Sequence, residues 1–376
     1  MRIVVVIPTY NEAGAIETVL EELKGVFSRA PQHEWYAVVV DGNSTDGTQE
    51  IVSKISRTYP SIHLVVEPEK RGLATAYLTG FAYATKTLHA DAYVEFDGDG
   101  QHDPSYLLPM AEALESGADY VIGSRYVAGG SVPAQWCLYN RLLSRLGSLY
   151  SRLLLELPVH DVTSGFKMTR VAPFAEKLPS RPDQLLTKDY AYKIQFLSEM
   201  HKLGAKITEV PIAFRHREQG TSKSTRRDIV ESLKVTAIIR LKNLRHWRLP
   251  RVLLIGGSGV ILQGIIFELL GIQWKLVSPS TATLVGAEFV ILSNFFLNER
   301  FSFKDKVAAS GSLLRRLVRF HLISSGSVIF QWLFIFITSL FTSNEAILRV
   351  SFIAALGLGF IVNYIGYYFW VWRSEK

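Results

Sequence analysis

The sequence predicts an α/β protein: a domain built on a mostly parallel, Rossmann-like sheet, followed by an all-α domain of four transmembrane helices. Three observations lead to this prediction. Short apolar runs alternate with segments of helical length in the first 225 residues. Polar loops that contain glycine follow several of these runs. After residue 250, four apolar stretches approach or exceed the length of about 20 residues that crosses a bilayer as a helix.

The apolar runs of the first domain are short and rich in β-branched residues, as expected of strands. They occupy residues 2–7, 35–40, 62–66, 93–96 and 120–122. Helical segments separate them, such as residues 16–27 and a helix whose cap we expect near Thr45 or Asp46. Because strands that are apolar throughout are covered on both faces, this order of elements predicts a parallel sheet between two layers of helices.

Polar loops at residues 8–12, 41–46 and 97–101 follow three of the predicted strands. Ligands of parallel sheets bind beyond the carboxyl ends of the strands, so we expect these loops to converge on one site. The last loop places Asp97 and Asp99 two residues apart on a turn that contains glycine. Both carboxylates can then reach one hard cation through oxygen, which is how a protein holds a metal on a diphosphate.

Two other interpretations of this loop were weighed against a metal site. An EF-hand is excluded, because counting from Asp97 puts His102 at the sixth position and Leu108 at the twelfth, where Gly and Glu are required. A polar surface turn is the second alternative, since Asp and Gly are ordinary turn formers. The convergence of three polar loops at strand ends favours the binding site.

Five ordered motifs carry a family resemblance. They are Ile7-Pro8-Thr9-Tyr10-Asn11-Glu12, Val40-Asp41-Gly42-Asn43-Ser44-Thr45-Asp46-Gly47-Thr48, Arg71-Gly72-Leu73, Asp97-Gly98-Asp99-Gly100-Gln101-His102 and Ile122-Gly123-Ser124-Arg125-Tyr126. This combination resembles the family 2 glycosyltransferases with the GT-A fold, and within them the dolichyl-phosphate or polyprenyl-phosphate mannosyl and glucosyl synthases. The resemblance covers residues 1–225. It implies transfer of a hexose from a nucleotide sugar to a lipid monophosphate, with inversion at the anomeric carbon.

On the donor side, the resemblance implies that Mg²⁺ or Mn²⁺ binds to Asp97, Asp99 and Gln101. Nucleotide-sugar contacts are implied for Pro8, Tyr10, Glu12, Asp41, Asp46, Arg71, Asp97 and Gln101. Helix capping explains Asp46 equally well. His102 is expected beside the metal ligands and not among them, because hard cations prefer oxygen.

On the acceptor side, the resemblance implies that basic and polar side chains bind the phosphate of a dolichyl or polyprenyl monophosphate. These residues are Arg125, Arg141, Ser144, Arg217 and Lys223. Arg125 is also expected to act in catalysis together with Asp97 and Asp99. The lipid phosphate is already ionised at neutral pH, so its attack needs cationic steering and no strong general base. Arginine suits this task because its guanidinium can bind phosphate through two donors.

The sequence departs from the family pattern at several positions. Asn140 stands where many relatives carry an arginine, so the acceptor role passes to the neighbouring Arg141. Lys193 and Gln195 stand where the family often has Gln and Glu. These differences leave the donor open, with GDP-mannose expected first and UDP-glucose second. Residues 161–166 do match the family's Asp-x-x-Ser-Gly-Phe segment.

The C-terminal part of the chain is strongly apolar, and it raises the hydrophobic share of the 376 residues to 48%. Its four predicted spans are residues 252–274, 281–299, 317–341 and 346–372. Residues 251–376 resemble the GtrA-type membrane module that follows the catalytic domain in some of these synthases. Basic residues precede the first span and fill the loop between the second and third, so the positive-inside rule places the catalytic domain and both termini in the cytoplasm. Trp274, Trp370 and Trp372 are expected as interfacial anchors.

Two amphipathic stretches adjoin the predicted catalytic site and the membrane module. Residues 136–157 and 229–244 carry apolar side chains at helical spacing, and the second lies within a linker of residues 226–250. Each is either core or a helix lying in the membrane interface. We favour the interface, because a lipid-linked acceptor has to be met at the bilayer surface.

The sequence also bears on other functions for the chain. The net charge of +7 does not indicate nucleic-acid binding, because no recognition motif accompanies the basic residues. The single Cys137 excludes a disulfide within the chain. A processive polysaccharide synthase should show a Gln-x-x-Arg-Trp motif, which the sequence lacks. A fused flippase for lipid-linked sugars stays open, since Glu268, Glu288 and Asn294 lie inside apolar spans. Whether the chain forms a homo-oligomer also stays open.

Overall fold

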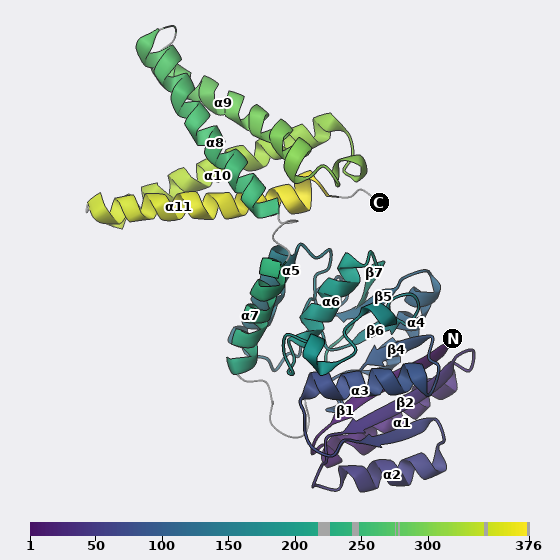
Figure 1. Cartoon of the computed structure of the whole chain (residues 1–376). Coiled ribbons are helices and arrows are strands. Elements are labelled where there is room, and N and C mark those ends of the chain that lie inside the picture. Colours follow the sequence, from purple (N-terminus) through teal and green to yellow (C-terminus); the bar gives the residue numbers. More distant parts are fainter. Residues whose placement is uncertain (217–225, 243–247, 275, 277–278, 342–344, 374–376) are drawn as a thin grey trace. The chain divides into compact units, whose positions relative to one another are not determined.

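A computed structural model of the chain describes residues 1–216, 226–242, 248–274, 276, 279–341 and 345–373. The chain divides into two compact units, residues 1–242 and 243–376, and each is described by itself (Figure 1). The first unit combines a sheet with helices, and the described part of the second is helical. Both findings confirm the predicted fold class.

The first unit contains a seven-stranded sheet with the strand order β3-β2-β1-β4-β6-β5-β7. The strands are β1 (Arg2–Thr9), β2 (Glu34–Asp41), β3 (Ile62–Val66), β4 (Ala92–Glu95), β5 (Tyr120–Ser124), β6 (Lys167–Arg170) and β7 (Ile207–Pro211). Neighbouring strands are parallel except at β6, which runs antiparallel to both β4 and β5. The carboxyl ends of β1, β2 and β4 therefore meet at one edge of the sheet.

Helices cover both faces of this sheet. They are α1 (Ala13–Arg29), α2 (Thr48–Thr58), α3 (Leu73–Lys86), α4 (Leu107–Glu115), α5 (Leu138–Leu155), α6 (Tyr192–Lys202) and α7 (Arg226–Lys242), with short 3₁₀ turns at η1 (Pro104–Tyr106), η2 (Ala175–Lys177) and η3 (Pro182–Gln184). Side chains alternate between the faces along each strand. In β1, Val5 belongs to the core beneath α1 and α4, while Val4 and Val6 belong to the core beneath α3 and α6.

The predicted strands and helices are confirmed, with differences of a few residues at their ends. The sequence missed β6 and β7. The cap of α2 falls one residue later than expected, at Gly47, whose φ of 96° suits glycine. Asp46 still contributes to the start of this helix, because its Oδ1 accepts a hydrogen bond from the backbone N–H of Thr48 at 3.1 Å.

Helices α5 and α7 pack against each other, and their buried residues include both polar and apolar side chains. The hydroxyls of Ser151 on α5 and Thr236 on α7 lie 3.0 Å apart and are buried, and Arg240 contacts Glu156 at 2.5 Å. The apolar residues of these helices include many exposed ones, namely Leu138, Tyr139, Leu142, Leu146, Leu149, Tyr150, Val230, Leu233, Ile238 and Leu241. Other apolar residues of the same helices, Leu155, Val235 and Ile239, are buried in the core of the first unit. Each helix therefore contributes to the core and also exposes apolar side chains.

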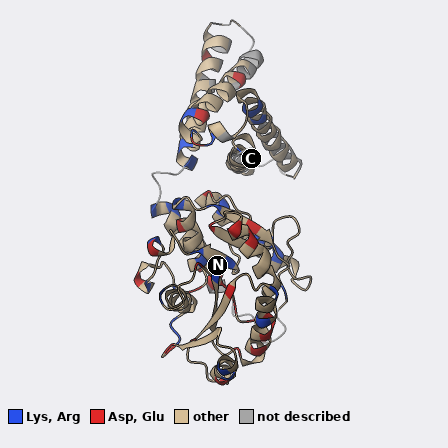
Figure 2. Cartoon of the chain, turned by 90° about the vertical axis from the view of Figure 1, so that its right-hand side faces the viewer, with Lys and Arg blue, Asp and Glu red and all other residues tan. Residues whose placement is uncertain are grey.

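The second unit consists of four long helices and short helical turns. They are α8 (Arg248–Ile266), α9 (Pro279–Leu297), α10 (Leu313–Phe341) and α11 (Glu345–Gly366), with η5 (Phe267–Gln273), η6 (Asn298–Ser302), η7 (Val307–Ala309) and η8 (Tyr367–Val371). These helices coincide with the four apolar stretches, and charged residues are sparse along them (Figure 2). Judged by length and apolarity together, none of the helices within the described ranges qualifies as a membrane span.

The core of the second unit is aromatic. Trp372 is fully buried and stacks on Phe303 with ring centroids 4.1 Å apart, and Phe320 stacks on Tyr367 at 4.2 Å. Of the three tryptophans predicted as interfacial anchors, Trp372 is therefore part of the packed core, whereas Trp274 and Trp370 are exposed.

Candidate active site

The predicted site residues after β4 lie on a short loop at the carboxyl edge of the sheet. The strand ends at Glu95, and the loop carries Asp97, Asp99 and Gln101 before η1 begins. Asp103 starts this turn by accepting a hydrogen bond from the Ser105 N–H at 2.8 Å. The sequence thus placed the paired carboxylates correctly at a strand end.

Asp97 is held by three side chains from different parts of the chain. Its Oδ1 accepts a hydrogen bond from the Tyr77 hydroxyl at 2.8 Å and from the Lys193 ammonium at 3.2 Å, and its Oδ2 lies 3.2 Å from Nε2 of His102. Burial favours the neutral acid, but the charge of Lys193 and the contact with His102 hold the pKa of Asp97 well below its usual range. Asp97 is therefore an ionised carboxylate with a fixed orientation.

His102 is buried among aromatic rings as well as against Asp97. Its ring lies 5.1 Å from Phe166, 5.3 Å from Phe214 and 5.6 Å from Phe96, measured between centroids. These contacts fix the imidazole beside the carboxylate. His102 therefore lies next to Asp97, one of the predicted metal ligands.

Asp99 and Gln101 are half-buried and connected to each other. Oδ1 of Asp99 accepts a hydrogen bond from the Gln101 N–H at 3.1 Å. The side-chain amide nitrogen of Gln101 donates to the carbonyl of Arg215 at 3.3 Å, so its amide oxygen is the atom that remains to bind a ligand. Carboxylate and amide oxygens are the donors that Mg²⁺ and Mn²⁺ prefer, so the residues of this loop fit such an ion.

Arg215 fixes the chain next to this loop. Its N–H donates to the carbonyl of Gln101 at 2.9 Å, and its guanidinium contacts Asp103 at 2.7 Å and Glu22 at 2.8 Å. Two predicted acceptor residues follow it, Arg217 and Lys223, and both lie outside the described residues.

The loop after β2 is ordered by two carboxylates. Asp41 is fully buried and accepts hydrogen bonds from Thr9, Ser44 and Gln49 at distances of 2.6 to 2.9 Å. Asp46 accepts the Ala13 N–H at 2.9 Å, which joins this loop to the start of α1. Both acids therefore shape the loop, and the capping role expected for Asp46 is present at the start of α2. Their contact with a nucleotide stays a prediction.

Burial disfavours the charge of Asp46, but hydrogen bonds from Thr48 and from the backbone outweigh this effect and lower its pKa. Pro8 near the end of β1, and Tyr10 and Glu12 in the turn that follows, are all partly exposed. The ring of Tyr10 lies 4.0 Å from the ammonium of Lys70. The turn after β1 therefore carries an aromatic ring next to a cation.

Arg71 lies farther along the same edge. Its guanidinium contacts the buried Glu67 at 2.6 Å, and Glu67 also accepts the Thr79 hydroxyl at 2.7 Å. Gly72 follows with a φ of 102°, and a Cβ atom there would lie 2.7 Å from the carbonyl of Lys188. Glycine is thus required next to Arg71 by the close approach of the chain before α6.

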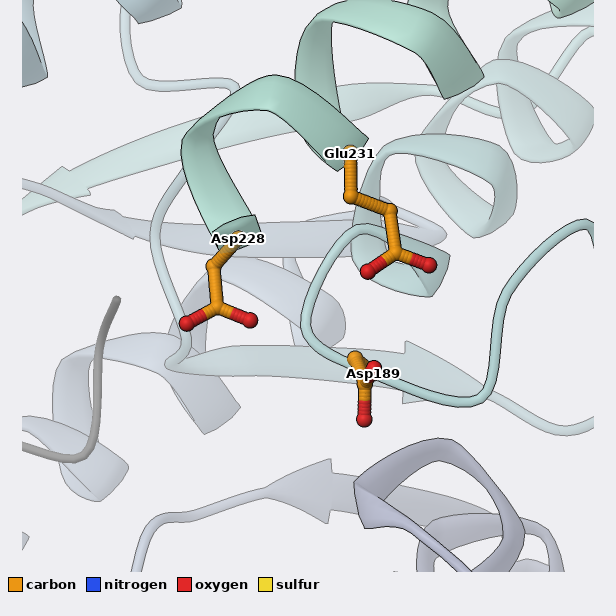
Figure 3. A group of neighbouring side chains, drawn as sticks. All are labelled: Asp189, Asp228 and Glu231. Carbon is orange, nitrogen blue, oxygen red and sulfur yellow. The ribbon is translucent and has the colours of Figure 1, made fainter. Parts of the chain in front are cut away.

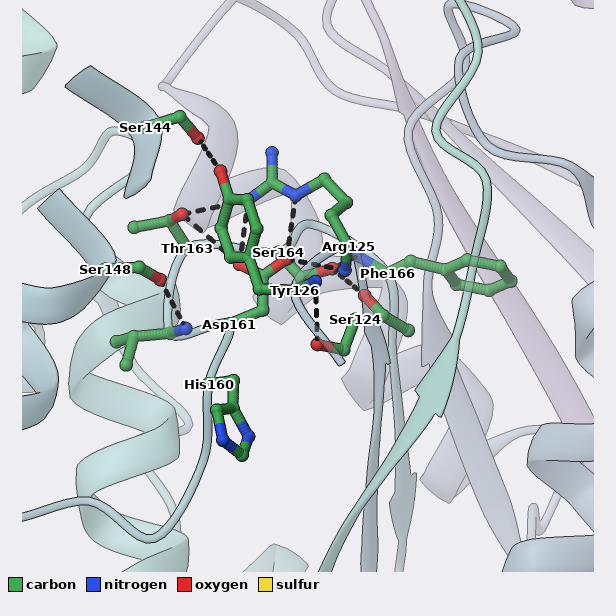
Figure 4. A network of polar contacts seen from close by, with 12 residues as sticks. Ser124, Arg125, Tyr126, Ser144, Ser148, His160, Asp161, Thr163, Ser164 and Phe166 are labelled. Atoms are coloured by element: carbon green, nitrogen blue, oxygen red, sulfur yellow. Dashed lines mark hydrogen bonds and ion pairs between the residues drawn. The ribbon is translucent and has the colours of Figure 1, made fainter. Parts of the chain in front are cut away.

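Arg125 forms a buried ion pair at the end of β5 (Figure 4). Its Nε and Nη2 bind the two oxygens of Asp161 at 2.7 and 2.8 Å, and Nη2 also donates to Thr163 at 2.9 Å. Burial opposes both charges, but the contact raises the pKa of Arg125 and lowers that of Asp161. The sequence predicted Arg125 as a phosphate ligand but not its carboxylate partner.

Ser144 and Arg141 come from α5. The Tyr126 hydroxyl, next to Arg125 in the chain, donates to Ser144 at 2.6 Å and links α5 to the site (Figure 4). Arg141 donates to the carbonyls of Trp136 and Ala134 at 2.9 and 2.6 Å. Ser144 is therefore brought to the Arg125 site, whereas Arg141 stabilises the turn that precedes its own helix.

Sequence reasoning missed several charged groups beneath the site. Glu95 on β4 pairs in register with Lys167 on β6, and both are fully buried. The hydroxyl of Tyr192 donates to Glu95 at 2.7 Å, and the ammonium of Lys167 donates to the carbonyl of Lys193 at 3.0 Å. Burial raises the pKa of Glu95 and lowers that of Lys167 to about 8. In the sequence, only the departure from the family pattern at Lys193 pointed to these buried charges.

Two carboxylates in the first turns of α7 and one on the segment before α6 lie close together (Figure 3). Oxygen atoms of Asp189, Asp228 and Glu231 lie within 4.8 Å of one another, and Glu231 also accepts a hydrogen bond from Thr187. Exposed acidic groups of this kind are common without an ion. We assign no function to this group.

Comparison with known proteins agrees with this geometry. The family model described as glycosyl transferase family 2 matches residues 4–177. An undecaprenyl-phosphate mannosyltransferase of Micrococcus luteus is 36% identical over 224 residues, which cover 59% of this chain and 87% of that protein. The chain belongs to glycosyl transferase family 2. It is a glycosyltransferase, and a polyprenol monophosphomannose synthase of Mycolicibacterium smegmatis is 34% identical over 62% of this chain and 84% of its own length.

The second unit has a match of its own. The family model described as GtrA/DPMS, transmembrane domain, matches residues 251–372. One relative extends over both units: a dolichol-phosphate mannosyltransferase of Pyrococcus furiosus is 29% identical over 382 aligned positions, covering 96% of this chain and 98% of that protein. The combination of the two domains in this family 2 glycosyltransferase therefore occurs in another protein in the same order.

Proposed function

We propose that this family 2 glycosyltransferase transfers mannose from GDP-mannose to a dolichyl or polyprenyl monophosphate, with inversion, at the cytoplasmic face of a membrane. The observation that carries the proposal is the loop after β4, which places the oxygen atoms of Asp99 and Gln101 at the carboxyl edge of the sheet. The names of three relatives, all lipid-phosphate mannose transferases, support the choice of sugar and acceptor.

The donor would lie along the loops that follow β1, β2 and β4. Tyr10 and Lys70 offer an aromatic face and a cation, and Arg71 offers a second cation held by Glu67. The predicted metal set is Asp97, Asp99 and Gln101, of which Asp97 is already engaged by three donors. A bound Mg²⁺ or Mn²⁺ would neutralise charge on the departing nucleoside diphosphate.

The acceptor phosphate would be steered by arginines. Arg125 is oriented by Asp161, and it stays protonated because that carboxylate raises its pKa. The ionised phosphate oxygen attacks the anomeric carbon from the side opposite the leaving diphosphate, which inverts that centre. Arg217 and Lys223 are proposed to complete the phosphate site.

The membrane would be met by two apolar surfaces. Exposed leucines of α5, such as Leu142 and Leu146, form the first. The second unit exposes large apolar side chains such as Val260, Ile261 and Phe341, which are 69%, 67% and 84% exposed. Large apolar side chains that are exposed together are expected where a protein contacts lipid or another protein. We propose four spans for residues 251–372, with the catalytic unit in the cytoplasm.

The test is transfer of labelled sugar by the purified chain. GDP-mannose or UDP-glucose is incubated with a polyprenyl phosphate and Mn²⁺, and the lipid-soluble product is analysed. The proposal predicts a mannosyl lipid that mild acid hydrolyses. This product should not form when a chelator removes the divalent metal ion. A glucosyl product would establish the second donor, and transfer to free sugar alone would contradict the lipid-phosphate acceptor. The other candidate function of the second unit is that of a flippase. A flippase would move the lipid-linked product from one leaflet to the other in vesicles that contain the protein.

A further inference from the structure

Lys193 places a cation inside the predicted metal site. Its side chain is fully buried, and its ammonium lies 3.2 Å from Oδ1 of Asp97 and 3.1 Å from the carbonyl oxygen of Gly165. The rings of Tyr77 and Tyr190 lie 4.9 Å from the same ammonium. The charge is therefore compensated within the protein before any ligand binds.

Neighbouring residues hold the Lys193 side chain next to Asp97. A Cβ atom at Gly165 would lie 2.6 Å from Oδ2 of Asp97 and 2.9 Å from the Lys193 ammonium, so only glycine leaves room for this pair. The Lys167 ammonium binds the carbonyl oxygen of Lys193 at 3.0 Å and fixes the start of α6. These contacts come from β6 and the segment before it, far from Asp97 in sequence.

Asp97 has little capacity left for a metal. A carboxylate offers about four lone-pair sites. Tyr77, Lys193 and His102 engage three of them, and a divalent cation approaching Asp97 would also meet the ammonium on the same carboxylate. Repulsion between two cations at such a short distance is severe in a partly buried site.

We propose that Lys193 is a positioning residue that makes Asp97 its own counter-ion, so that the metal is bound by Asp99 and Gln101 without Asp97. This inference rests on the proposed function, because the metal belongs to the proposed reaction. It changes one member of the predicted ligand set. The metal would then be bound by one carboxylate, that of Asp99, where the sequence predicts two.

The test is Mn²⁺ binding to the purified full-length protein with GDP present, measured by electron paramagnetic resonance without turnover. Asp97→Asn combined with Lys193→Gln removes the ion pair as a whole and should change the Mn²⁺ Kd by less than about threefold. Asp99→Asn should raise the Kd about tenfold or more, as expected for loss of a charge-assisted contact. Lys193→Gln should tighten Mn²⁺ binding about tenfold, because Asp97 is then released to bind the ion. Adding Asp97→Asn to Lys193→Gln should remove this gain.

Lys193→Arg is the conservative variant and should keep the wild-type Kd, and GDP binding without metal reports whether each variant is folded. Weakening by Asp97→Asn/Lys193→Gln equal to that by Asp99→Asn would overturn the inference, as would an unchanged Kd in a folded Lys193→Gln protein. Wild-type protein that binds no Mn²⁺ would overturn both the inference and the metal-dependent reaction. If Mn²⁺ binding behaves as expected but no sugar reaches the lipid, the proposed function fails and the inference on Lys193 stands.

Discussion

Arg125 and Asp161 are joined through two oxygen atoms, at 2.7 and 2.8 Å, and both side chains are buried. The arginine that we propose for the lipid phosphate is therefore also the partner of a buried carboxylate. Removing one member of such a pair leaves an uncompensated buried charge, which is far more costly than loss of a surface contact.

Asp161→Asn is predicted to lower the free energy of unfolding by about 3–5 kcal/mol, because Arg125 then remains buried without its counter-charge. Thermal or chemical unfolding of the purified protein measures this loss. Asp183→Asn is the matched control, since the Arg181–Asp183 pair is 69% and 68% exposed at 3.4 Å. Exposed pairs contribute about 0–1 kcal/mol, so equal effects of the two variants would contradict a structural role for Asp161.

The same pair shows what the sequence could predict and what it could not. The loop with Asp97 and Asp99 is local, so its place at a strand end followed from the apolar run before it. Asp161 stands 36 residues from Arg125, and Lys193 stands 96 residues from Asp97. These pairings depend on the insertion of β6 between β4 and β5, which the sequence pattern did not reveal.

The missed strands have physical explanations. β6 reads Lys-Met-Thr-Arg and has no apolar run, because its buried Lys167 is compensated by Glu95 on the neighbouring strand. β7 is an edge strand that ends in Pro211, where a proline is tolerated since no further strand needs its N–H. The pairing of Lys167 with Glu95 and the edge position of β7 arise only when the sheet is assembled, so the sequence pattern alone did not predict either strand.

Arg217→Ala is predicted to raise the KM for polyprenyl phosphate about ten- to a hundredfold, the effect of losing a charge-assisted phosphate contact. The Kd for the free nucleotide should stay unchanged, because the loops after β1, β2 and β4 are proposed to hold the donor. Steady-state kinetics and nucleotide titration separate the two. Lys202→Ala serves as a control, since Lys202 pairs with Glu199 on the surface of α6. A loss of nucleotide affinity equal to the loss of acceptor use would refute the assignment of Arg217.

Leu146→Ser on α5 is predicted to reduce turnover with long polyprenyl phosphates more than with short, soluble analogues. Leu146 is 57% exposed, so the change removes apolar surface from the proposed lipid face without opening a core cavity. Turnover is compared across acceptor chain lengths. Tyr59→Ser, at a residue 40% exposed after α2, should have no dependence on chain length. Equal losses with short and long acceptors would argue against a lipid-seating role for α5.

Lys167 provides a prediction on pH. Burial lowers its pKa to about 8 from an ordinary value of 10.5, so between these values the unfolded chain binds more protons than the folded protein. Stability from this group must therefore rise as pH increases from 8 to 10.5 and stay level below pH 8. The difference in unfolding free energy between wild type and Lys167→Met should grow by up to about 3 kcal/mol over this window. Denaturation at several pH values measures it, with Glu95→Gln/Lys167→Met to account for the partner carboxylate. A constant difference would show that Lys167 keeps its ordinary pKa.

The last prediction concerns topology. The loop between the second and third predicted spans is basic and contains Arg300, Lys304 and Lys306. The loop near residues 274–280 has only Lys275. Basic loops remain in the cytoplasm, so the short loop should face the opposite side.

Because Cys137 is the single cysteine of the chain, Cys137→Ser gives a background in which one introduced cysteine can be labelled. Ser278→Cys is predicted to react with a membrane-impermeant maleimide in intact cells, and Lys304→Cys only after the membrane is opened. The two positions control for each other, since both lie in loops next to predicted spans. Labelling of Lys304→Cys in intact cells, or protection of Ser278→Cys, would overturn the four-span arrangement with a cytoplasmic catalytic unit.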